Sequence, residues 1–401
     1  ASDVYKRQVT KSMAQENYPA QLKAISLNTA AMYPGLLPKL GNVAAIEYGS
    51  GLTLAYAFLN TDLGSIGILT SPVMPVSLLG ITPADTGDSD GDDFVEAGIA
   101  PRAPMNQIGL SYAMNLDDAM SLGLLLTYGA FSEAWENKMP TEAGYTDSPD
   151  KTSEGYSSLG VTLGLSISGD MPIDIGIKLG MGNQFANELD MDDITGDDLL
   201  EEDMKSDIMS IVGSARVGID NWYAALGLEY KSGENKWATS VDGDLEFTAS
   251  LKNSAIDVSL LAGYKLQATE TLCILIGSGI EMSMYQEADL LAKNEITDDE
   301  LHGNKKDAWT DISVPLNIAV EGKINDTWSI NAGTKVTVLE LNSTSYKENQ
   351  DALYEELDMK EYWVDSEFVR ESDIDYSVGV TGKFGDITVD WNLSTSLLLD
   401  G

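Results

Sequence analysis

The sequence predicts an all-β protein, an antiparallel transmembrane β-barrel of about fourteen strands and no more than about sixteen. Three observations predict this fold: segments that alternate apolar with small polar residues, tight turns that join these segments in pairs, and long acidic stretches between the pairs. Alternation with a period of two is typical of strands, and tight turns join antiparallel neighbours.

The clearest alternation lies in residues 157–182. Every odd position from Leu159 to Ile167 and from Ile173 to Met181 is apolar, whereas the even positions are almost all small or polar. The few residues between the two runs leave room only for a hairpin turn. One face of this hairpin is therefore wholly apolar, as lipid requires, and the other is suited to a polar lumen.

The other predicted strands follow in chain order with the same alternation, and most of them span about 10 to 14 residues, enough for a tilted membrane crossing. The N-terminal pair has the weakest pattern. The pairs, each with its turn, are 52–58 and 66–68 around 61–62, 108–114 and 120–128 around 115–118, 211–219 and 222–230 around 220–221, 256–266 and 272–284 around 267–270, 312–324 and 328–338 around 325–327, and 374–384 and 387–393 around 385–386.

Long polar segments alternate with these tight turns, so one end of the sheet is predicted to be short and the other long. This asymmetry is typical of outer-membrane barrels, which have short periplasmic turns and long extracellular loops. The alternative is a soluble β-sandwich or solenoid, but its water-facing positions are usually rich in Lys, Glu and Thr. The predicted loops are about 72–104, 132–154, 185–205, 286–308 and 346–372.

Aromatic residues on the apolar face form two groups, as two interfacial girdles would. One group lies near the short turns and the other near the long segments. The first comprises Tyr112, Trp222, Tyr264, Trp328 and Phe384, and the second Tyr128, Tyr230 and Tyr376.

The composition excludes several classes of protein. The 401 residues carry a formal net charge of −40, which argues against nucleic acid as a partner because phosphates require Lys and Arg. No run of about 18 uncharged apolar residues predicts a transmembrane helix. The single cysteine, Cys273, allows no internal disulfide.

Both ends of the chain are interpreted as incomplete. The first residues, 1–8, lack the apolar region of a signal peptide and look like an artefactual leader, so we expect the export signal upstream. At the other end, the last predicted strand ends on the loop side, at Asp400 and Gly401, whereas such barrels normally finish in the periplasm. We therefore expect a missing last strand, unless the N-terminal strands are misassigned by one.

Residues 1–43 are predicted to form an N-terminal extension, and residues 44–401 the barrel. The extension could be a plug inside the lumen, a periplasmic arm or an unrecognised strand, and the plug is the preferred interpretation. A continuous helix or a central strand is disfavoured by Pro19, Pro34 and Pro38.

The alternating strands make the chain resemble Gram-negative outer-membrane β-barrel proteins, and the strand number and N-terminal extension are similar to those of the long-chain fatty-acid transporter family. That resemblance implies an N-terminal plug inside a fourteen-stranded barrel that passes hydrophobic compounds, with outer-membrane lipid and lipopolysaccharide as surroundings. The family's Asn-Pro-Ala element is absent, because this chain reads Tyr18-Pro19-Ala20 and Asn28-Thr29-Ala30. No substrate residue is carried over, and general porins of larger strand number are an alternative.

Charged residues on the polar face are candidate pore-lining residues. They could set the selectivity of an open pore, or they could form an ion-paired network that fills a closed barrel. By alternation they are Asp174, Lys178, Arg216, Glu229, Asp257, Lys265, Glu281, Glu321, Lys323, Lys335, Asp375, Lys383 and Asp390.

The predicted loops hold candidate calcium ligands. Carboxylates at alternate positions around a glycine suit Ca²⁺, and Asp88, Asp90, Asp92 and Asp93 surround Gly91. The spacing is not that of an EF-hand, so the preferred interpretation is a solvated charge run. A third alternative is that divalent ions bridge these loops to lipopolysaccharide. A second acidic run covers residues 188–203.

No catalytic constellation accompanies these features, so an enzyme is not expected. The single histidine, His302, lies among acidic residues but without a matching motif, and Cys273 is expected to be a small filler on the lumen face. We expect no cofactor, with Ca²⁺ in the loops as the exception. The predicted function is passive passage of small or hydrophobic solutes. The alternative is a structural or interaction protein of the envelope, whose loops form a layer or hold a homo-oligomeric or other partner.

Overall fold

The computed structural model describes most of the predicted barrel and a short segment before it. The described residues are 31–40, 42–49, 52–73, 105–138, 149–191, 199–241, 244–294, 299–303, 306–347, 364–367, 374–384 and 387–394. The predicted calcium ligands Asp88, Asp90, Asp92 and Asp93 therefore lie outside the described residues, as do residues 1–30 of the N-terminal extension.

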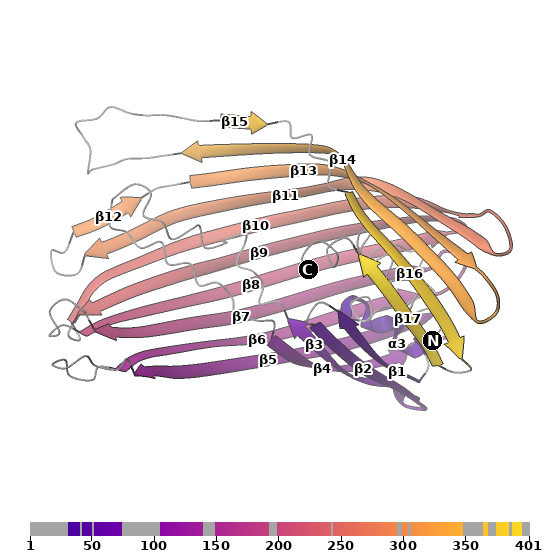
Figure 1. Ribbon diagram of the computed structural model, residues 1–401, viewed down its shortest axis with the longest axis horizontal. Helices are drawn as coiled ribbons and strands as arrows, with labels where there is room; N and C mark the ends of the chain where they lie inside the picture. Colours follow the sequence, from indigo (N-terminus) through magenta and orange to yellow (C-terminus); the bar gives the residue numbers. More distant parts are fainter. Residues whose placement is uncertain are drawn as a thin grey trace.

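Seventeen strands and two short helical turns make up the described part of the chain (Figure 1). The helical turns are η3 (Pro34–Leu36) and α3 (Leu37–Leu40). The strands are β1 (Val43–Gly49), β2 (Leu52–Thr61), β3 (Gly64–Val73), β4 (Met105–Asn115), β5 (Met120–Lys138), β6 (Pro149–Ile167), β7 (Ile173–Met191), β8 (Leu199–Ile219), β9 (Trp222–Val241), β10 (Asp244–Gln267), β11 (Leu272–Asn294), β12 (Asp299–Gly303), β13 (Lys306–Lys323), β14 (Trp328–Lys347), β15 (Val364–Glu367), β16 (Ile374–Phe384) and β17 (Ile387–Ser394).

The fold class is an all-β antiparallel sheet, as predicted. Each strand pairs with the next from β1 to β11, and the ladder continues through β13, β14, β16 and β17. The short strands β12 and β15 pair with the loop-side ends of β11 and β14. Without these two, fifteen strands form the ladder, close to the predicted number. The sheet curls, so that its first and last strands lie at the same end of the molecule (Figure 1).

The strands are longer than predicted, and much of the predicted loop sequence is hairpin. The β5–β6 ladder runs on to the pair Lys138 and Pro149, and the β7–β8 ladder to Met191 and Leu199. Thus parts of 132–154, 185–205 and 286–308 are strand rather than loop. The reason is that neither face is apolar there, so the period-two signature disappears although the backbone ladder continues.

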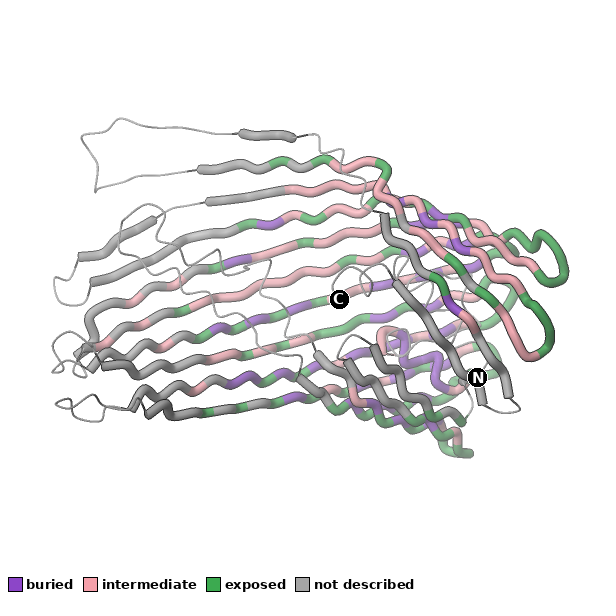
Figure 2. Tube along the Cα trace, in the orientation of Figure 1, coloured by how far each residue is buried: buried purple, intermediate pink, exposed green. Residues whose placement is uncertain are grey.

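Alternate residues of β4 to β9 differ in exposure, as the sequence pattern predicts (Figure 2). On β2 the predicted apolar face is wrong, because Phe58 is 3% exposed and packs against residues 31–40, whereas Leu59 is 55% exposed. On the central strands, Leu163 is 52% exposed and Ile177 is 51% exposed, whereas Thr162 and Ser166 between the apolar positions are buried. We call the exposed apolar side the outer face. The opposite side, which residues 31–40 contact, is the inner face.

Aromatic residues contribute to both faces. On the outer face, the rings of Trp222 and Tyr264 lie 4.8 Å apart, in the predicted girdle near the short turns. On the inner face, the Tyr223 side chain lies over Gly263, its pairing partner in β10. Such an aromatic side chain covers the backbone that a glycine exposes in a sheet. The side chains of Phe384 and Tyr376 lie outside the described residues.

No helix in the described part of the chain is long and apolar enough to cross a membrane.

Candidate functional site

Residues 31–40, which we call the inner segment, lie on the inner face near the short turns. Pro34 opens the helical turn η3, where its missing N–H costs no hydrogen bond. The buried side chains of Tyr33, Leu36 and Leu37 pack against a hydrophobic cluster from β2, β3, β4 and β5. This apolar contact holds the inner segment against the sheet. The sheet residues of the cluster are Phe58, Leu69, Ala113 and Leu125.

A row of glycines gives the inner segment its seat. Gly123, Gly164 and Gly176 are successive pairing partners across β5, β6 and β7. A Cβ atom on Gly123 would lie 2.2 Å from the carbonyl carbon of Pro34, and one on Gly176 would lie 2.1 Å from the carbonyl oxygen of Met32. Only a backbone without a side chain allows this approach, so the row forms a groove that fits the inner segment.

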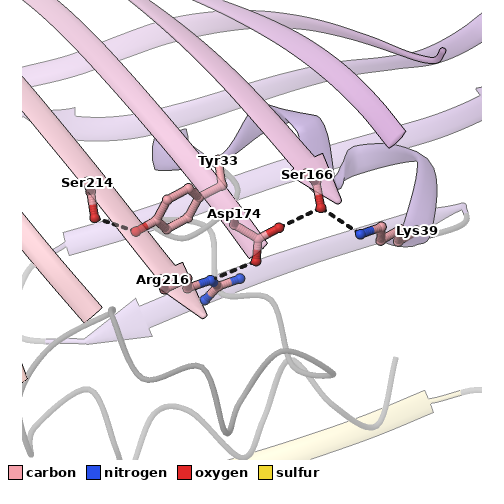
Figure 3. A network of polar contacts seen from close by, with 6 residues as sticks. All are labelled: Tyr33, Lys39, Ser166, Asp174, Ser214 and Arg216. Carbon is pink, nitrogen blue, oxygen red and sulfur yellow. Dashed lines mark hydrogen bonds and ion pairs between the residues drawn. The ribbon is translucent and has the colours of Figure 1, made fainter. Parts of the chain in front are cut away.

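A polar row lies beside the glycine row, two residues closer to the short turns on each strand. It consists of four inner-face partners across β5 to β8, namely Ser121, Ser166, Asp174 and Arg216. The Ser121 hydroxyl donates to the carbonyl oxygen of Gly35 at 2.6 Å. The Lys39 ammonium donates to Ser166 Oγ at 2.6 Å, and Ser166 donates in turn to Asp174 Oδ1 at 2.5 Å (Figure 3). The polar row thus holds the inner segment at Gly35 and at Lys39.

Arg216 joins this network to the aromatic ring of the inner segment. Its Nε donates to Asp174 Oδ2 at 2.9 Å, and both side chains are 1% exposed. Its guanidinium carbon lies 4.7 Å from the centroid of the Tyr33 ring, a cation–π contact. The Tyr33 hydroxyl shares a hydrogen bond with Ser214 of β8 (Figure 3). Tyr33 is therefore held by its ring face and by its hydroxyl.

The network contains two cations and one carboxylate. Burial lowers the pKa of Lys39, the nearby Asp174 carboxylate opposes this change, and the Arg216 charge adds to it. Arg216 Nη2 is buried and has no hydrogen-bond partner among the residues that the structure describes. Lys39 and Arg216 together therefore carry one more positive charge than Asp174 neutralises.

A cavity of about 680 Å³ lies on the inner face beside the inner segment. Met32 of that segment closes part of it, and hydroxyls of Thr162 and Ser210 line the wall. Its charged lining residues are Lys178, Glu229, Asp257 and Glu281, four of the predicted pore-lining residues. The curled sheet brings together side chains that are over 100 residues apart in the sequence.

These charges follow the pairing register. One inner-face row crosses from β7 to β10 through Lys178, Val212, Glu229 and Asp257. Lys231 Nζ lies 3.3 Å from a carboxylate oxygen of Glu229 and 3.3 Å from one of Asp257. Lys231 therefore neutralises part of the carboxylate side of the row.

The other predicted pore-lining residues are spread along the sheet. Lys265 and Glu321 are half-buried near the short turns, and the Lys323 ammonium donates to Asp326 Oδ1 at 2.8 Å and lowers the pKa of Asp326. Cys273 is half-buried and pairs in register with Glu321. The side chains of Lys335, Asp375, Lys383, Asp390 and His302 lie outside the described residues.

Sequence reasoning missed several residues of the network. Lys231 follows Glu229 at the right parity, but the predicted strand ended at residue 230. Ser166 appeared only as a small lumen residue, although its register with Asp174 follows from the hairpin. The places of Tyr33 and Lys39 carried no sequence signal, because their segment shows no strand alternation. Within the described residues, no group of three or more His, Cys, Asp or Glu side chains is arranged to hold a metal.

The chain is similar to solved structures but matches no sequence family. No family profile matches the chain, and no curated protein matches it. The translocator domain of the autotransporter NalP from Neisseria meningitidis matches with a TM-score of 0.34 and 13% identity, over 69% of this chain and 83% of that one.

Two receptor structures match as well. The ferric yersiniabactin uptake receptor FyuA from Yersinia pestis has a TM-score of 0.38 and 9% identity, over 86% of this chain and 65% of that one. The siderophore receptor PiuA from Acinetobacter baumannii has a TM-score of 0.27 and 10% identity, over 88% of this chain and 76% of that one. All three are outer-membrane β-barrels. Because these scores are low, the fold assignment rests on the strand pairing itself.

Proposed function

We propose that this chain is an outer-membrane β-barrel of a Gram-negative bacterium that lets small solutes pass along its inner face. The observation that carries the proposal is the contrast between the two faces. The outer face is apolar and exposed from Leu110 to Val338, whereas the inner face, beyond the hydrophobic cluster under the inner segment, carries buried hydroxyl, amide and charged side chains and a cavity. In water the outer face would be a very large exposed apolar patch, which monomeric soluble proteins avoid.

The height of the apolar band supports a membrane location. On β7 the outward apolar residues run from Ile173 to Met181, and these eight steps of about 3.3 Å give about 26 Å along the strand. At a strand tilt of about 40° this length gives a band about 20 Å tall, compared with about 25 Å for the outward apolar band of a bilayer-spanning barrel. Beyond it, the outer positions Asn183, Asp207 and Glu234 form a polar row in register.

The cavity favours polar solutes over hydrophobic ones. Apolar side chains such as Leu69, Leu125 and Ile208 line part of it, but four charged side chains and several hydroxyl groups line the rest, and a long-chain hydrocarbon would have to displace the water that solvates these charges. We therefore propose small polar solutes as cargo, rather than the hydrophobic compounds of the fatty-acid transporter family. The inner segment narrows the path at the short-turn end.

Conductance across a planar bilayer tests the proposal. The purified protein is expected to produce discrete current steps in KCl and to let small sugars swell proteoliposomes. An electrically silent protein that excludes every solute would overturn the channel.

A structural or interaction role is the second candidate, and one observation favours it. Hairpins continue well beyond the apolar band, to Met191 on β7 and Val241 on β9, so that a paired sheet projects past the band. Such a sheet could form a surface layer or hold an envelope partner. A swelling assay separates the two functions, because a purely structural barrel passes no solute.

A further inference from the structure

We propose that the inner-face cavity takes small zwitterions, solutes that carry an ammonium and a carboxylate, as an amino acid does. This inference rests on the proposed channel function and names its substrate class. It follows from the placement of opposite charges on two walls of the cavity.

Lys178 supplies the positive wall. It stands on β7, its side chain is exposed toward the cavity, and among the described residues it makes no ion pair. Its register partner on β8 is Val212, which is uncharged. An exposed ammonium with no carboxylate partner beside it is available to an anionic group of a solute.

Carboxylates supply the negative wall. Glu229 on β9, Asp257 on β10 and Glu281 on β11 all line the cavity. Lys231 contacts the first two but carries a single charge. Glu229, Asp257 and this lysine by themselves leave one net negative charge, which attracts the cationic group of a solute.

The spacing of the walls fits a small dipolar molecule. In the register, Lys178 and Glu229 are separated by β8 alone, so their backbones lie about 10 Å apart. Both side chains leave the same face of the sheet and are long enough to lean over Val212, which neutralises neither. A solute whose two charges are a few ångströms apart can then contact both.

Hydroxyl groups complete the lining. Thr162 pairs in register with Lys178, and Ser210 lies next to Val212 along the inner side of β8. They can donate to a carboxylate or accept from an ammonium. Met32 of the inner segment limits the depth of the cavity, which favours small solutes.

Uptake of an isosteric pair tests the inference. Proteoliposomes with the full chain receive radiolabelled alanine, a zwitterion, or lactamide, its neutral isostere, at micromolar concentration. Alanine is expected to enter about threefold faster, the effect of one partly exposed ion pair. In Lys178→Gln and in Glu229→Gln the ratio of alanine to lactamide uptake is expected to fall toward one. Raising the KCl concentration should lower the ratio in the same way, through screening.

Lys265→Gln is the matched control, because Lys265 does not belong to the cavity lining. In this variant the ratio of alanine to lactamide uptake should equal that of the unmodified chain. Equal entry of the two solutes, or a ratio that survives Lys178→Gln, overturns the zwitterion inference alone and leaves the channel standing. Entry of neither solute overturns the channel function and the inference together.

Discussion

Arg216 bonds to Asp174 at 2.9 Å and lies 4.7 Å from the Tyr33 ring centroid, so one side chain links the sheet to the segment that covers it. The ion pair belongs to two neighbouring strands and is closed off from solvent. The inner segment is therefore held by the contact of Tyr33 with Arg216, and the ion pair with Asp174 fixes the position of Arg216.

Removing the carboxylate of this pair should destabilise the protein strongly. Asp174→Asn leaves the buried guanidinium without its counter-charge, and we expect the free energy of unfolding to drop by about 3–5 kcal/mol. Urea denaturation of the lipid-inserted protein measures it. Asp257→Asn serves as the control, since Asp257 is partly exposed and should cost less than about 1 kcal/mol. Equal losses at the two sites would contradict a special role for the buried pair.

Filling the glycine row should displace the inner segment. In Gly176→Val the new side chain collides with the backbone of Met32, so the segment must leave its groove or the strands must shift, at a cost of about 1–3 kcal/mol. We expect faster proteolysis of residues 31–40 and a higher conductance. Gly213→Ala is the matched control, because a Cβ atom there meets open space. Unchanged cleavage in Gly176→Val would argue that the segment is not seated there.

The stability of the docked segment should depend on pH through Lys39. Burial lowers the pKa of Lys39 below its ordinary value of 10.5. Between the lowered pKa and 10.5 the undocked state binds more protons, so docking gains stability as pH rises through this window. Below the lowered pKa both states are protonated and this dependence vanishes. The melting temperatures of the unmodified chain and of Lys39→Met, measured across alkaline pH, isolate the contribution of Lys39. The same dependence of melting temperature on pH in both proteins would contradict it.

Charge on the outer face should be costly only within the apolar band. Leu163 lies at the middle of the band on β6, and Leu163→Arg should cost about 2–4 kcal/mol in folding into lipid. Ser157→Arg, beyond the band, should cost no more than about 1 kcal/mol. Reversible folding into vesicles gives both values. A stable, detergent-free soluble monomer with Leu163 buried inside would overturn the membrane assignment.

The acidic run around Gly91 lies outside the described residues, so calcium binding by this run stays a prediction. Titration calorimetry of the chelator-treated protein with Ca²⁺ should show heat of binding if Asp90 and Asp92 are ligands. Asp90→Asn with Asp92→Asn should then abolish that heat. No heat in the unmodified chain would leave these carboxylates as a solvated charge run.

The sequence by itself determined the fold class and the two faces of the sheet. Residues 159–167 and 173–181 alternate without exception on the apolar side, and this pattern predicts strands with different surroundings on their two faces. It also placed Lys178, Glu229, Asp257 and Glu281 on the polar side by parity alone. Alternation is a local property of the backbone, and for that reason it is readable in a single chain.

Only the tertiary structure decided which of these residues meet. Register across neighbouring strands set Lys178 opposite Val212 rather than a carboxylate, and it aligned three glycines into a groove. The docking of Tyr33 and Lys39 depends on that groove, which is assembled from strands about 90 to about 140 residues further along the chain. Strand length beyond the band also required the structure, because backbone pairing continues there without an apolar face to mark it in the sequence.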